Sequence, residues 1–83
     1  MIEMQYEIEV CLQPESEGGY SVYLPRLAGV VSEGETKTEA LRNIGEALTG
    51  ALQTYEELNE EVPWRDSSGL SLEHEIRAWI TLP

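Results

Sequence analysis

The chain of 83 residues contains one cysteine, one histidine and no phenylalanine. A single cysteine, Cys11, excludes a disulfide framework within the chain. With His74 as the only histidine, no Cys/His cluster is available for a structural metal. A chain this short is near the lower size at which one core is self-sufficient, so the sequence predicts one domain that gains buried area as a homodimer or higher homo-oligomer.

Long apolar runs are also missing. No stretch approaches the roughly 20 residues of a membrane span. The N-terminal segment Met1–Glu7 lacks the basic start and the apolar centre of a signal peptide. These absences predict a soluble protein of the cytoplasm that makes no contact with a membrane.

Basic residues are scarce, since five Lys and Arg stand against 16 Asp and Glu and leave a formal charge of −11. Affinity for nucleic acid comes largely from basic side chains that neutralise phosphates, and the five basic residues form no patch in the sequence. Direct binding to nucleic acid is therefore not expected. An anionic surface suits a cationic partner, although the charge could instead serve solubility alone.

One long helix is the clearest element in the sequence. Thr36 and Glu39 have the spacing of a capping box, which predicts a helix that begins at about Lys37. We expect it to continue to about Glu60, before Pro63. Apolar residues then recur at steps of three and four and form one stripe: Leu41, Ile44, Leu48, Leu52 and Tyr55.

Four segments alternate between apolar and polar residues and predict strands: Met4–Leu12, Tyr20–Leu24, the surroundings of Val30–Ser32, and Ile76–Leu82. Residues 62–69 have loop composition, and residues 70–75 could hold another turn or the lead-in to the last strand. The order strand, strand, strand, helix, strand predicts an α+β fold with a mostly antiparallel sheet in the order 3-2-1-4 and the helix on one face. A right-handed crossover after the helix would lay the last strand parallel to the first.

The alternation also divides the sheet into two faces. One face would pack its apolar side chains on the helix stripe: Met4, Tyr6, Ile8, Val10, Tyr20, Val22, Ile76, Ala78 and Ile80. The other would carry Glu7, Glu9, Cys11, Tyr23 and Trp79, with no further element to cover it. A surface that mixes aromatic side chains and carboxylates is typical of an interface, and the alternative is a solvated face with scattered aromatics.

Several short motifs together resemble HicB-like antitoxins of bacterial and archaeal toxin–antitoxin systems. The resemblance covers roughly residues 4 to 63. Its motifs are Gly18-Gly19-Tyr20, Leu24-Pro25-Arg26-Leu27-Ala28-Gly29, Ser32-Glu33-Gly34-Glu35-Thr36, Glu39-Ala40, Asn43 and Glu46-Ala47. Where the family usually has a cysteine after the Pro-x-x-x-Gly turn, this chain has Val30.

The resemblance implies a partial ribonuclease-H-like domain that binds and neutralises HicA, a small basic toxin that cuts mRNA. Antitoxins of this family usually carry a second, DNA-binding domain as well. This chain ends at Pro83, so we expect residues 1–83 to be a single HicB-like domain without that second domain. The alternative is an orphan interaction module of the same fold that has no toxin partner and no catalysis.

Candidate toxin-binding residues follow from the net negative charge of the chain and from the division of the sheet into a packed face and an open face. On the open face they are Glu7, Glu9, Tyr23 and Trp79, and at the end of the helix they are Glu56, Glu57 and Glu60.

Catalysis is not expected. Ribonuclease-H-like nucleases hold two metal ions with converging carboxylates, whereas Glu39 is explained here as the helix cap. The sequence thus predicts no enzyme and no catalytic, metal or cofactor site.

Overall fold

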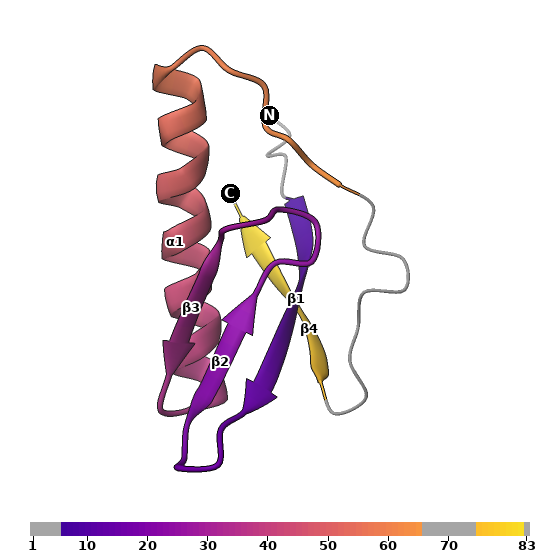
Figure 1. Cartoon of the computed structure of the whole chain (residues 1–83), viewed down its shortest axis with the longest axis vertical. Coiled ribbons are helices and arrows are strands. Elements are labelled where there is room, and N and C mark those ends of the chain that lie inside the picture. The colour runs from indigo at the N-terminus through magenta and orange to yellow at the C-terminus, as the bar shows by residue number, and fades with distance from the viewer. Residues whose placement is uncertain (1–5, 66–74, 83) are drawn as a thin grey trace, which may run out of the picture.

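The computed structural model describes residues 6–65 and 75–82. Its elements follow the predicted order: β1 (Tyr6–Pro14), β2 (Tyr20–Tyr23), β3 (Val31–Gly34), α1 (Lys37–Glu57) and β4 (Ile76–Leu82). The strands form one sheet in the order β3-β2-β1-β4, in which all neighbours are antiparallel. Helix α1 lies on one side of this sheet, alongside β3 (Figure 1). The predicted α+β class and strand order are therefore confirmed.

The direction of β4 was wrongly predicted. β4 runs antiparallel to β1, with Ile76 opposite Leu12 and Leu82 opposite Tyr6. The crossover rule assumes that the last strand starts near the end of the helix. Here residues 58–75 separate α1 from β4, and β4 starts instead at the end of the sheet where α1 begins (Figure 1). β4 therefore runs in the direction opposite to the predicted one.

Helix α1 begins as its capping box predicts. The Glu39 N–H donates to the Thr36 hydroxyl oxygen at 3.1 Å, and Thr36 has extended backbone angles. The helix ends at Glu57, three residues before the predicted end, because Asn59 adopts a left-handed conformation with φ 56°. The Glu60 N–H then donates to the Tyr55 carbonyl at 2.9 Å, which closes the helix end.

The core lies between the sheet and the helix stripe. From α1, Ala40, Ile44 and Leu48 are buried completely. The sheet contributes Val10, Leu12 and Val22, and the turn between β2 and β3 contributes Leu24, Leu27 and Val30. The predicted inner face is confirmed for the described side chains, with Ile8, Tyr20, Ile76, Ala78 and Ile80 partly buried against this cluster. Met4 and the Tyr6 side chain, also predicted there, lie outside what the structure describes.

Polar contacts attach the chain after α1 to the turn between β2 and β3. The Arg65 N–H donates to the Arg26 carbonyl at 2.8 Å, and Arg65 Nε donates to the Pro25 carbonyl at 2.7 Å. The guanidinium group of Arg26 lies 5.7 Å from the centre of the Trp64 ring. The indole is 41% exposed, so this tryptophan covers an arginine at the surface and does not close the core.

Candidate protein-binding surfaces

The face of the sheet that points away from α1, called the open face below, collects four of the predicted site residues. Strand register places Glu9 opposite Trp79 and Cys11 opposite Tyr23. Glu7 lies one pleat further along β1 on the same face. Glu7, Glu9, Tyr23 and Trp79 therefore form one surface across three strands, as the alternation predicted.

The open face is anionic, but its carboxylates differ in availability. The Glu9 side chain is 15% exposed, and its Oε2 lies 3.8 Å from Arg77 Nη1. Glu7 is exposed at the start of β1. Because Arg77 already lies beside Glu9, Glu7 is the more accessible anion for a cationic partner.

Two large apolar side chains stand out from the same face. Trp79 is 61% exposed and Val31 is 65% exposed. Val31 lies opposite Tyr23 in the register of β2 and β3, so the open face continues to the β3 edge. Exposed apolar groups next to carboxylates have the composition of an interface core within a polar rim.

A polar cluster lies between these groups. The Tyr23 hydroxyl donates to both carboxylate oxygens of Glu75, at 2.7 Å and 2.8 Å. Cys11, predicted on an uncovered face, is 1% exposed beside them. Burial, more than any neighbouring group, raises the pKa of the Cys11 thiol, and it also raises the pKa of Tyr23, to which the Glu75 carboxylate adds. A buried thiol with a raised pKa is not a nucleophile at neutral pH.

Sequence reasoning missed Glu75 and Val31 as members of this face and did not count Arg77 among its site residues. Val31 and Arg77 follow from the strand alternation once the register is known. Glu75 precedes β4 and has no place in a periodic pattern, so its contact with a tyrosine 52 positions away is set by tertiary structure alone.

The second predicted group lies at the C-terminal end of α1. Glu56, Glu57 and Glu60 are all exposed there, and the last turn of the helix contains no basic residue. Carboxylates at this end add to the negative pole of the helix dipole, which costs some helix stability and concentrates negative potential. This end of α1 lies at the end of the molecule where β1 begins (Figure 1). The helix glutamates form a second anionic surface, separate from the open face.

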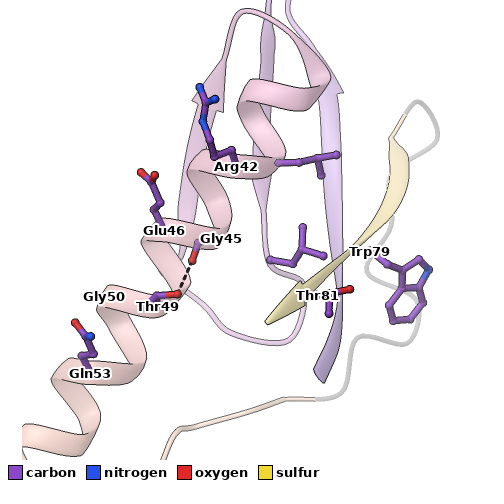
Figure 2. A pocket seen from close by; sticks show the side chains of 10 residues that line it. Arg42, Gly45, Glu46, Thr49, Gly50, Gln53, Trp79 and Thr81 are labelled. Atoms are coloured by element: carbon purple, nitrogen blue, oxygen red, sulfur yellow. Dashed lines mark hydrogen bonds between the residues drawn. The ribbon is translucent and has the colours of Figure 1, made fainter. Parts of the chain in front are cut away.

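A hollow of about 620 Å³ runs between α1 and the second half of β4. Gly45 and Gly50 lie on its helix wall, where an added Cβ would meet nothing within 4 Å. Figure 2 shows Trp79 pointing away from the helix, and Arg42, Glu46 and Gln53 rising from α1. The two glycines therefore do not serve to bring the helix closer to the sheet. They leave the side of the helix that lines the hollow without side chains at these two positions.

Across residues 6–65 and 75–82, no three His, Cys, Asp or Glu side chains are grouped in a way that could hold a metal ion. No helix in that part of the chain is long and apolar enough to cross a membrane.

Residues 6–81 match the model of the HicB-like antitoxin of bacterial toxin–antitoxin systems. The chain belongs to this HicB-like antitoxin family. The predicted resemblance is confirmed, and the match includes β4, which lay beyond the motifs found in the sequence.

Similar proteins agree with this assignment. The chain is 41% identical over 54 residues to Antitoxin HicB 1 of Photorhabdus laumondii, a match that covers 65% of this chain and 35% of that protein. The chain thus spans about a third of the length of this curated HicB relative.

Two solved structures have the same fold. The N-terminal domain of the Burkholderia pseudomallei antitoxin HicB superposes with a TM-score of 0.74 at 27% identity, over 94% of this chain and 99% of that one. A chain of the HicA3 and HicB3 toxin–antitoxin complex has a TM-score of 0.70 at 18% identity, over 89% of this chain and 94% of that one. At that identity the second structure supports the fold alone.

Proposed function

We propose that this HicB-like domain binds a small basic toxin of the HicA type, which cuts mRNA, and neutralises it by protein contact. The observation that carries the proposal is the open face, where Glu7 lies exposed on the same surface as the exposed ring of Trp79. Family membership supports a toxin–antitoxin role. A protein with the same fold occurs in a solved toxin–antitoxin complex, that of HicA3 and HicB3, and this is the precedent for a complex of the kind proposed here.

The charges suggest how neutralisation works. A ribonuclease that binds mRNA must present basic groups to the phosphates. A domain with a net charge of −11 attracts such a protein over a distance and orients it on approach. The Glu7 carboxylate can then occupy a basic group that would otherwise hold a phosphate. RNA and antitoxin would compete for one surface of the toxin.

The proposed residues have different roles. Glu7 and Trp79 contact the toxin, because one is an exposed anion and the other an exposed aromatic anchor. Tyr23 and Glu9 position the surface, since Tyr23 donates to Glu75 and Glu9 lies beside Arg77. The glutamates at the end of α1, Glu56, Glu57 and Glu60, contribute to attraction at longer range. We propose no catalytic role for any of them.

The test starts with capture of binding proteins from a lysate of the organism that carries this chain. We expect a small basic protein that cleaves RNA, and cleavage that stops when the chain is added in equimolar amount. If only the chain itself returns, under conditions where a control antitoxin captures its toxin, the orphan-module alternative takes the place of this proposal.

Variants then locate the surface. Trp79→Ala should weaken toxin binding by about 30-fold or more, as loss of a central aromatic anchor does. Glu7→Lys should weaken it by about tenfold or more, whereas Glu17→Lys, the same charge change in the exposed turn between β1 and β2, should change it by less than about threefold. Equal effects of Glu7→Lys and Glu17→Lys would show that net charge, and not the open face, determines binding.

A further inference from the structure

The two edges of the sheet are not equally protected. β3 has four residues, and the Asn43 side chain of α1 donates from Nδ2 to the Glu33 carbonyl at 2.8 Å. β4 has seven residues, and within the described chain no strand pairs with its second side. Natural sheets keep edge strands short or cover them, because an open edge pairs readily with another strand. By this comparison β4 is an open edge and β3 is a closed one.

Helix α1 does not cover the β4 edge either. The hollow described above separates the Gly45 and Gly50 side of the helix from Trp79, Ile80 and Thr81 of β4 (Figure 2). On the side of β4 that faces the helix, Ala78 and Ile80 remain only partly buried. A strand added to β4 would therefore meet an accessible backbone and two apolar side chains.

The charges of β4 determine what kind of strand fits. Its sequence Ile76–Leu82 contains Arg77 and no acidic residue, in a chain with 16 acidic residues. A basic partner finds no carboxylate on this strand. A second copy of the chain, which would be repelled by acidic surfaces elsewhere, meets no like negative charge here. The edge therefore suits self-association, whereas the open face suits a cationic toxin.

We propose that β4 pairs antiparallel with β4 of a second copy, about a two-fold axis at Trp79, to form one sheet of eight strands. Only this register gives all seven residues of the strand a partner in the second β4. Partners then point to the same side of the sheet, so that each face continues from one copy to the other. On the helix side, Ala78 then packs against Ile80 of the second copy. On the open face, the two Trp79 rings become a cross-strand pair.

The register also fixes the position of the only charge on the strand. Arg77 lies opposite Thr81 of the second copy, and the two Arg77 residues are four positions out of register, about 13 Å apart at roughly 3.3 Å per residue. Thr81 is exposed and, within its own chain, lies opposite Glu7. A negative charge at position 81 would thus be repelled by Glu7 of its own chain and attracted by Arg77 of the second copy. A positive charge there would be attracted by Glu7 and repelled by that Arg77.

This property gives a test by sedimentation equilibrium of the chain alone. Thr81→Glu should strengthen the dimer by about threefold or more, because it faces Arg77 of the second copy, and Thr81→Lys should weaken it by a similar factor. The effects on the stability of the monomer are opposite, because within one chain a glutamate at position 81 would be repelled by Glu7, whereas a lysine there would be attracted by Glu7. If the substitutions acted only through the stability of the monomer, Thr81→Lys would therefore form the stronger dimer. That result would overturn the proposal, and so would a chain that stays monomeric up to about 1 mM.

Cross-linking provides an independent measurement. Trp79→Cys should form an interchain disulfide under mild oxidation, since residue 79 meets its own counterpart on the axis. Thr81→Cys, the matched control on the same strand and face, should not, because its counterpart lies four positions away. Equal cross-linking of the two variants would contradict the register. Neither assay contains a toxin, so their failure would leave the proposed toxin binding untouched.

Discussion

Among the glycines in the described part of the chain, Gly34 is the one where an added side chain would disturb the fold most. It is the last residue of β3, opposite Tyr20, and it touches the first turn of α1. A Cβ at this position would lie 2.8 Å from both the Ala40 Cα and the Glu39 carbonyl carbon, and closer still to the Ala40 N. All three atoms belong to the backbone of the helix, so no side-chain rotation can relieve the contact.

The size of the effect follows from what would have to move. The helix start would shift away from β3, which disturbs the Thr36 cap on Glu39 and the packing of the fully buried Ala40. Overpacking of this kind costs about 1–3 kcal/mol, and loss of a cap costs about 1 kcal/mol more. We expect Gly34→Ala to lower the free energy of unfolding by about 2–4 kcal/mol, out of about 4–12 kcal/mol for a chain of this length.

The assay is urea unfolding followed by circular dichroism, at one fixed protein concentration. Gly45→Ala is the matched control, because it lies within α1 and its added Cβ would meet nothing within 4 Å. This variant should be more stable than the wild type by about 0.5–1 kcal/mol, as expected for glycine to alanine in a helix. A Gly34→Ala chain within about 0.5 kcal/mol of the wild type would refute the proposed contact between β3 and α1.

Three further predictions concern the cap, the partly buried polar cluster of Tyr23 and Glu75, and the end of the helix. Thr36→Ala should lower the free energy of unfolding by about 1 kcal/mol, measured in the same urea assay, and Thr36→Ser should restore most of it because serine keeps the acceptor. Both Cys11 and Tyr23 have raised pKa values in the folded chain, so the unfolded chain loses these protons first and stability should fall as the pH rises above about 9. Tyr23→Phe should make that fall shallower in thermal melts between pH 8 and 11, and an unchanged slope would contradict the assignment. Glu57→Lys should raise the melting temperature, through the helix dipole, while it weakens toxin binding at low salt.

The sequence predicted the elements that depend on local patterns. The spacing of Thr36 and Glu39 placed the start of α1 at the correct residue, because capping is decided within one turn. The end of α1 was placed too late because it depends on the left-handed backbone of Asn59, and Asn is only one of several residues that can end a helix. The alternation in β1 and β4 assigned their faces correctly, because side chains alternate in every strand.

What the sequence could not predict depends on contacts between distant residues. The direction of β4 could not be predicted because residues 58–75, which separate α1 from β4 in the sequence, contain no periodic pattern. The burial of Cys11 on the open face has the same origin, since Tyr23 and Glu75 lie beside it and come from other segments of the chain. The residues proposed to contact the toxin thus follow from alternation, whereas the cluster that supports them follows only from the structure.

The measurement that tests the account most directly is inhibition of the captured toxin at two salt concentrations. The proposal predicts that RNA cleavage falls to background at about one chain per toxin, and that the affinity drops at least tenfold between about 50 mM and 500 mM salt, because opposite charges attract the two proteins. Self-association of the chain should strengthen over the same range, because added salt screens the repulsion between two copies of charge −11. Cleavage that continues unchanged with an excess of folded chain would contradict the proposed function.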